Sequence, residues 1–263
     1  MYRFIDTHTH LDGKEFDEDR DLVVQRAKGS GAIALFVPAT DLSTSLASLR
    51  LSELYPGFIF PMAGLHPEEV NEGYLSQLEG IRDIIYSDFS QNIKRFIGIG
   101  EVGLDFYWSR EHEKEQMSAF ERQVEWSVET RLPLMIHCRK AQNEMISIMK
   151  PYAKELPGGV FHCFTGNINE AEQLLQFEGF CLGIGGVLTF KKSRLPEVIK
   201  SVPINRIVLE TDSPYMSPEP LRGKRNESSH IPYIIYKLAE AFGTTPDHIA
   251  EQTTQNAIKL FLE

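Results

Sequence analysis

FIDTHTHLD, residues 4–12, begins as an apolar run and changes abruptly to polar residues that include two histidines. In an extended strand the side chains at positions i and i+2 point to the same face. His8 and His10 would therefore present two imidazole nitrogens side by side, where the strand ends and the backbone enters a loop. Two imidazoles at this spacing form half of a divalent-metal site, although a polar loop that happens to contain two histidines gives the same pattern.

Short apolar runs recur along the chain and alternate with segments of helical periodicity, as in parallel sheets that are buried on both faces. The 263 residues are close to the length of one (β/α)8 barrel, about 250 residues. We therefore predict a single α/β domain, residues 1–263, folded as a (β/α)8 TIM barrel, with an open doubly wound sheet as the competitor. The expected strands are 3–6, 32–38, 58–64, 95–100, 134–137, 160–162, 180–183 and 206–210, and the expected helices are 15–29, 43–55, 74–90, 111–130, 140–154, 168–178, 194–200, 231–242 and 247–261.

Composition and charge limit the class of protein. No apolar run approaches the roughly 20 residues that cross a bilayer, so we expect no membrane association. A strand and a polar motif occupy the N-terminus, so we expect no signal peptide and a cytoplasmic location. The formal net charge of −10 argues against a broad basic surface that coats nucleic acid, but not against an enzyme that neutralises one phosphodiester locally. No obligate protein partner is evident.

Metal-competent side chains fall at the C-terminal ends of five expected strands, where barrels of this kind build their active sites. Each has an ordinary structural explanation alone, but together they indicate a metal centre. Six ligands exceed the three of a mononuclear hydrolytic zinc site, so we expect two divalent ions bridged by Glu101. The expected ligands are His8, His10 and Asp212 for one ion, His137 and His162 for the other, and Glu101 for both.

Five sequence blocks in this order resemble the TatD-type metal-dependent deoxyribonucleases, within the amidohydrolase-like barrels. They are FIDTHTHLD at 4–12, GEVGLDFY at 100–107, PLMIHCR at 133–139, HCFTG at 162–166 and ETDSPY at 210–215. The resemblance continues to RGKRNE at 222–227 and so covers nearly the whole chain. It implies a (β/α)8 barrel with a two-metal site, and all six expected ligands match the family's ligand positions. Two departures, Asn143 for an acidic residue and Ser228 for a proline, concern the substrate edge.

Further residues receive roles in catalysis or substrate binding. Asp212 is the candidate to orient the attacking water and take its proton, and Glu101 bridges the ions. His66 is assigned to the substrate, where it positions a phosphate or protonates the leaving oxygen, with a structural role as the alternative. Arg139 and Arg225 are candidates for phosphate binding, with solvated loop charge as the alternative. The mixed ligand set leaves Zn, Mn, Mg, Co and Ni open.

Residues near the expected ligands have less certain roles. The aromatic residues 106–108 follow the Glu101 motif and would either stack bases or pack under a lid. Asp105 is expected to support the Glu101 loop. Strand alternation is expected to turn the sulfur atoms of Cys138 and Cys163 away from the site.

These observations favour a metal-dependent hydrolase that cleaves phosphodiester bonds of DNA as a 3′–5′ exonuclease, with single-stranded ends as substrate. The resemblance implies DNA as the substrate, and the expected metals and basic loops indicate phosphodiester hydrolysis. One alternative is hydrolysis of another ester on the same site, such as the D-aminoacyl ester of a mischarged tRNA. An alternative of another class is a non-catalytic metal-binding scaffold.

Overall fold

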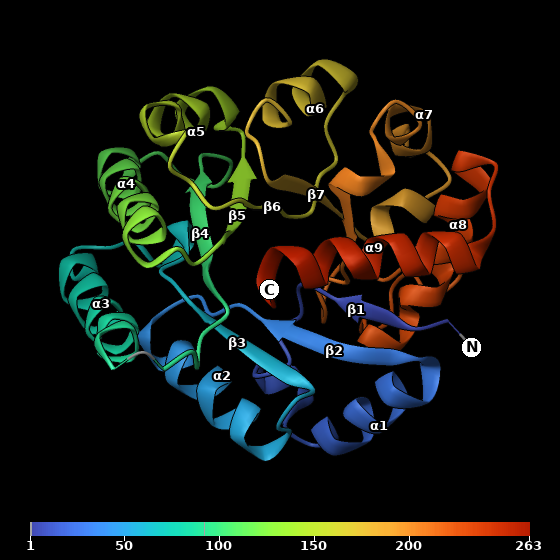
Figure 1. Ribbon diagram of the computed structural model, residues 1–263, viewed down its shortest axis with the longest axis horizontal. Helices are drawn as coiled ribbons and strands as arrows, with labels where there is room; N and C mark the ends of the chain where they lie inside the picture. The colour runs from blue at the N-terminus through green and yellow to red at the C-terminus, as the bar shows by residue number, and fades with distance from the viewer. Residues whose placement is uncertain (1, 92) are drawn as a thin grey trace.

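Eight parallel strands alternate with helices in the computed structural model, which describes residues 2–91 and 93–263 (Figure 1). The strands are β1 (Phe4–Asp6), β2 (Ala32–Val37), β3 (Ile59–Ala63), β4 (Gly98–Asp105), β5 (Leu134–Arg139), β6 (Gly159–Phe161), β7 (Phe180–Ile184) and β8 (Ile207–Leu209). The helices are α1 (Arg20–Ser30), α2 (Leu42–Leu54), α3 (Tyr74–Ser90), α4 (Glu113–Thr130), α5 (Gln142–Met149), α6 (Ile168–Leu174), α7 (Leu195–Ile199), α8 (Ile231–Phe242) and α9 (Pro246–Phe261). Each strand pairs with the next one along the chain.

The backbone just beyond β1 and β8 brings the two edge strands together. The Thr7 amide donates to the Leu209 carbonyl at 3.0 Å, and the Asp212 amide donates to the His8 carbonyl at 2.9 Å. Thr9 and Ser213 form a parallel bridge one step further on. These bonds close the sheet, and a doubly wound sheet would not pair its strands in chain order. The predicted TIM barrel is therefore confirmed.

Strand alternation divides the apolar core into an inner and an outer part. Inward-facing side chains fill the barrel, and outward-facing ones pack against the helices. The inner cluster consists of Ile5, Ala34, Phe36, Met62, Met135, Val160, Cys181 and Val208, together with Ala257 and Phe261 of α9. Helix α9 crosses the mouth of the barrel in Figure 1. Asn256 of this helix donates to the carbonyls of Ile204 and Ile207, at the start of β8. Because α9 covers the N-terminal mouth, the C-terminal mouth remains for polar side chains.

The main difference from the expected elements is in β4, which extends to Asp105 instead of ending at residue 100. A loop was expected from residue 101 on, but the strand continues, and Gly103 allows close packing against the next strand. A Cβ on Gly103, whose φ is 143°, would lie 1.8 Å from the His137 carbonyl oxygen on β5. The register shifts between Ile99 and Val102, an irregularity that re-aims side chains at strand ends. Glu101 therefore projects from a strand rather than from a loop.

Helix α1 begins at Arg20, five residues later than expected, because Lys14–Phe16 form a separate 3-10 turn. Across residues 2–91 and 93–263, none of the helices combines the length and the apolar character that crossing a bilayer requires.

Candidate metal centre

Strand alternation brings the expected ligands into the C-terminal mouth. Met135 and Val160 belong to the inner core. His137 stands two positions beyond Met135 on β5, and His162 directly follows β6, two positions beyond Val160. His8 follows β1 and is fully buried. The predicted convergence of these side chains at one end of the barrel is what the structure shows.

Glu101 lies at the centre, with one carboxylate oxygen directed at each of two imidazole pairs. Its Oε2 is 3.1 Å from His8 Nε2 and 3.4 Å from His10 Nε2. Its Oε1 is 2.8 Å from His162 Nε2 and 3.0 Å from His137 Nδ1. Burial alone would raise the pKa of Glu101, but the surrounding imidazoles lower it well below its usual value. The group is therefore a carboxylate with two separate acceptor sides, as a bridging ligand requires.

The donor atoms on the Oε2 side of Glu101, here called the first half of the centre, belong to His8, His10 and Asp212. The two Nε2 atoms are 3.2 Å apart, and Asp212 Oδ1 lies 3.8 Å from the first and 3.6 Å from the second. Ligands about 2.1 Å from a tetrahedral cation are about 3.4 Å from one another. The donor atoms are therefore spaced as ligands of one divalent ion would be.

In the second half, His137 Nδ1 lies 3.3 Å from His162 Nε2. The other ring nitrogen of His137, Nε2, is 2.9 Å from Asp105 Oδ2. Asp105 Oδ1 accepts from the Tyr107 amide at 2.8 Å, which fixes the carboxylate. A proton held on Nε2 leaves the Nδ1 lone pair for a cation, the usual arrangement behind a ligating histidine. Asp105 thus supports His137, and not the Glu101 loop as expected.

His66 reaches the same rim, with Nε2 at 3.4 Å from Glu101 Oε1. Distance alone allows His66, Glu101 and His137 to hold a cation. However, His66 Nδ1 accepts a hydrogen bond from the Glu68 amide at 3.2 Å. Burial lowers the pKa of His66, and a neutral imidazole that accepts at Nδ1 carries its proton on Nε2. In this tautomer Nε2 of His66 has no lone pair for a cation, and it can donate a hydrogen bond at the rim.

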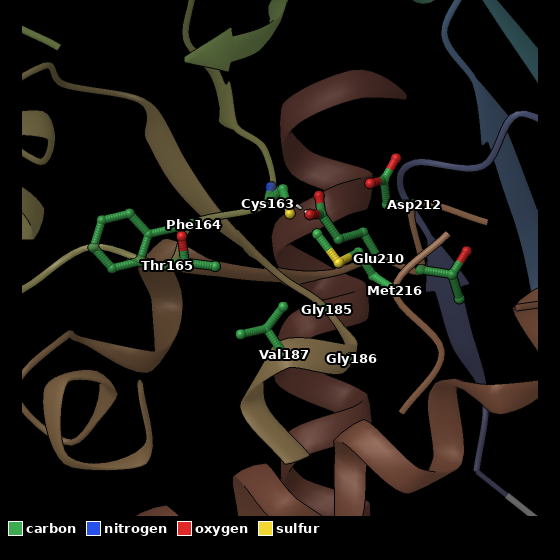
Figure 2. A pocket seen from close by; sticks show the side chains of 10 residues that line it. Cys163, Phe164, Thr165, Gly185, Gly186, Val187, Glu210, Asp212 and Met216 are labelled. Atoms are coloured by element: carbon green, nitrogen blue, oxygen red, sulfur yellow. Dashed lines mark hydrogen bonds between the residues drawn. The ribbon is translucent and has the colours of Figure 1, made fainter. Parts of the chain in front are cut away.

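Glu210 was not among the predicted site residues, yet its fully buried carboxylate lies under the centre. Its Oε1 is 3.7 Å from His162 Nδ1, and it accepts from the Cys163 amide (Figure 2). Burial raises the pKa of Glu210 to about 8. Together with His8 and His162 it forms a further group that could hold a cation. The signal was available, because Glu210 stands two positions after the inward-facing Val208.

Gly183 of β7 makes room for this carboxylate, since a Cβ there would lie 2.1 Å from Glu210 Oε2. The expectation that Cys163 points away was wrong: this residue lines a pocket with Glu210 and Asp212 (Figure 2). Strand β6 ends at Phe161 and Cys163 has a φ of 49°, so alternation no longer applies there. Cys138, in contrast, packs against the outer core as expected.

The two predicted arginines lie in different surroundings. Arg139 is at the end of β5, with its guanidinium carbon 3.6 Å from the centroid of the Tyr107 ring. Arg225 binds both carboxylate oxygens of Asp19, at 2.8 and 2.7 Å, and also pairs with Glu227 at 3.1 Å. These contacts tie Arg225 to the start of α1. The phosphate-binding prediction for Arg225 therefore finds no support in this geometry.

Ser228, one of the two departures from the family pattern, supports the seam between β1 and β8. It is buried and forms a hydrogen bond with the carboxylate of Asp6. Asp6 Oδ2 also accepts from the Thr211 hydroxyl at 2.6 Å. Ser228 therefore acts on the backbone beneath the site, and not at the substrate edge as expected. Nothing in the structure explains Asn143.

The donor set fits divalent cations. Imidazole and carboxylate ligands are mixed, which suits Zn, Mn, Co and Ni, and Mg through the carboxylates. Two imidazole nitrogens face each other in each pair, His8 with His10 and His137 with His162. Two facing lone pairs repel, so each pair requires a proton or a cation between the nitrogens. The His and Glu clusters are thus consistent with a divalent-metal site.

Comparison with known proteins agrees with this geometry. The family model described as TatD related DNase matches residues 5–262. The chain is 35% identical over 257 residues to a Bacillus subtilis (strain 168) protein named uncharacterized metal-dependent hydrolase YabD, covering 97% of this chain and 98% of that one. It is 33% identical over 258 residues to the 3′-5′ ssDNA/RNA exonuclease TatD of Rahnella sp. (strain Y9602), covering 96% and 95%. The crystal structure of YJJV, a TatD homolog from Escherichia coli K12, superposes with a TM-score of 0.88 at 28% identity, over 99% and 98% of the chains. The chain therefore belongs to the TatD-related DNase family.

Proposed function

We propose that this protein is a metal-dependent hydrolase that cleaves phosphodiester bonds of DNA, releasing nucleotides from the 3′ end of single strands. The observation that carries the proposal is the position of Glu101, with one oxygen on each of two imidazole pairs. Two divalent cations held this way would lower the pKa of a bound water and neutralise charge on the scissile phosphate.

The protein's own residues supply the remaining steps. Besides Glu101, Asp212 has a carboxylate oxygen near both His8 and His10, so we assign it to orient the attacking water and take its proton. His66 has a hydrogen on Nε2 at the same rim, and we assign it to donate a hydrogen bond to the scissile phosphate or the leaving oxygen. Arg139, two residues beyond His137 at the end of β5, is the remaining candidate to bind the phosphate.

The choice of substrate rests on family membership and charge. The relatives named as TatD act on single-stranded DNA and RNA from the 3′ end. The net charge of −10 does not favour a protein that grips long duplexes by a broad basic face. A single strand that enters one end at a time needs only local neutralisation, which the metal centre and Arg139 provide.

Asp212→Asn tests the proposal. This variant should keep the barrel folded, with an unchanged far-ultraviolet circular dichroism spectrum, but lose most turnover on a 3′-labelled single strand, by about 100-fold or more for a lost proton acceptor. The matched control is Asp88→Asn, which alters a buried carboxylate bound to Arg95, outside the mouth. It should keep wild-type turnover.

The same assay separates the alternatives when it includes RNA oligonucleotides and a D-aminoacyl-tRNA ester. Ester cleavage without nucleotide release would assign the centre to the ester reaction. Cation binding without turnover of any of these substrates would leave a metal-binding scaffold. Near-full activity of Asp212→Asn would remove this residue from the mechanism.

A further inference from the structure

A second cavity lies beside the metal centre, on the side of His66 and His137. Its volume is about 360 Å³, toward the lower end of the roughly 300–1,000 Å³ of small-molecule sites. The 3-10 helix Pro67–Glu69 forms one wall, and the end of β4 with the segment leading to α4 forms the others. The cavity is therefore large enough for a planar ring system.

The cavity and the metal centre share a wall. Asp105 lines the cavity, and its Oδ2 is 2.9 Å from His137 Nε2. Glu68, which also lines it, donates its backbone amide to His66 Nδ1. A phosphodiester placed at the centre would thus have the cavity within reach of the groups attached to it.

One side of the cavity is an uncovered aromatic ring. Trp108 lines it and is 70% exposed, although tryptophan is usually largely buried. The guanidinium carbon of Arg139 lies 5.2 Å from the Trp108 ring centroid and 3.6 Å from that of Tyr107. Exposed aromatic rings beside a cation are the usual platform on which nucleic-acid bases stack.

The polar groups of the cavity determine what it accepts. Glu68 and Glu111 contribute carboxylates, which are hydrogen-bond acceptors only. Within residues 2–91 and 93–263, Glu111 forms no ion pair, so its carboxylate remains available. Carboxylates repel a phosphate but accept from an amino group such as that of cytosine. Thymine and uracil present a carbonyl oxygen at the equivalent position, which a carboxylate repels.

We infer that this cavity is a nucleobase subsite, which takes a base next to the scissile phosphate, stacks it on Trp108 and accepts its amino group at Glu111. The inference rests on the proposed function and adds to it a preference for bases with an amino group over thymine and uracil. Arg139 would then bind the phosphate and also pack against the Tyr107 and Trp108 rings.

A thermodynamic cycle that combines one protein variant with one altered substrate tests the stacking. Trp108→Ala and the wild type are compared on thymidine oligonucleotides whose last two 3′ positions carry either cytosine or an abasic sugar. With cytosine, Trp108→Ala should raise KM by roughly five-fold or more, the smallest effect expected of a lost base–aromatic stack. With the abasic sugars, the difference between the two proteins should fall below about two-fold. Phe89→Ala, which removes an exposed ring near the end of α3, is the control and should leave KM unchanged.

Glu111→Gln tests base identity. The wild type should cleave strands ending in cytosine with a kcat/KM at least about three-fold above those ending in thymine, as a hydrogen bond to a charged acceptor allows. The amide of glutamine also donates, so the variant should lose most of this preference while it still cleaves both strands.

The outcomes distinguish the subsite from the nuclease function. If the wild type releases no nucleotide from any strand, the proposed function fails and the subsite falls with it. If nucleotides are released but Trp108→Ala loses equally on cytosine and abasic ends, the stacking inference is overturned. A cytosine preference that Glu111→Gln leaves intact would overturn the assignment of Glu111.

Discussion

Asp105→Asn should change the tautomer of the His137 imidazole without removing the ring. In the wild type, Asp105 Oδ2 holds the proton of His137 Nε2, while Oδ1 accepts from the Tyr107 amide. An asparagine that keeps its oxygen on the Tyr107 amide turns its NH2 group toward His137. The imidazole then accepts at Nε2 and carries its proton on Nδ1, the atom that lies 3.0 Å from Glu101. In this tautomer Nδ1 has no lone pair for a cation.

The size of the effect follows from the position of Asp105 behind the ligand. Changing such a supporting carboxylate typically costs about 10- to 100-fold in metal affinity, or about 1.4–2.8 kcal/mol of binding free energy. Asp105 makes no contact with His8, His10 or Asp212 among the described hydrogen bonds and ion pairs. We therefore expect one of two cation sites to weaken, and the other to keep its Kd.

Isothermal titration calorimetry of the metal-free protein with Mn²⁺ or Zn²⁺ measures both sites. The control is again Asp88→Asn, a buried carboxylate outside the mouth. It should bind like the wild type. Two sites of wild-type affinity in Asp105→Asn would refute the tautomer argument, and equal weakening of both sites would refute the division of the centre into two halves.

Three other outcomes follow from the structure. Gly183→Ala places a Cβ against Glu210 and should lower the free energy of unfolding by about 1–3 kcal/mol in chemical denaturation. The control Gly29→Ala in α1, which has open space around the new Cβ, should be neutral or slightly stabilising. Equal effects of the two variants would contradict the role given to Gly183. Hydrogen bonds from Arg225 and Arg26 lower the pKa of Asp19 to about 2, so the stability they give is present above about pH 4 and is lost as the pH falls toward 2. Arg225→Ala should therefore lower Tm at pH 7 by more than at pH 3 and leave KM unchanged, and a raised KM with an unchanged Tm would restore its phosphate-binding role. Metal affinity, measured by chelator competition, should rise between pH 6 and 8. Burial alone would lower the pKa of His10 and His137, but their carboxylate partners raise it overall, and a bound cation must displace those protons. A Kd that does not change with pH would contradict this.

The sequence allowed prediction of those features that depend on local periodicity. Alternation along β5 and β6 places His137 and His162 on the inner face beyond Met135 and Val160, and apolar strands in chain order specify the barrel. Glu210 follows the same rule and was missed because Asp212, at the next position of the same face, was taken as the only ligand of its strand.

Features that depend on long-range contacts could not be predicted. Arg225 lies in a basic stretch that suggested phosphate binding, but its partner Asp19 is 206 positions away in the chain. The extension of β4 depends on Gly103 packing against His137 of the next strand, which no local pattern shows. The hydrogen bond that sets the tautomer of His66 likewise depends on the backbone of the 3-10 helix that follows it.

Anomalous diffraction from crystals grown with Mn²⁺ or Zn²⁺ would locate the cations at the Glu101 carboxylate. We expect two peaks, one on each side of the Glu101 carboxylate: the first among His8, His10 and Asp212, the second between His137 and His162. One peak alone at full metal saturation, or peaks away from Glu101, would contradict the two-metal centre.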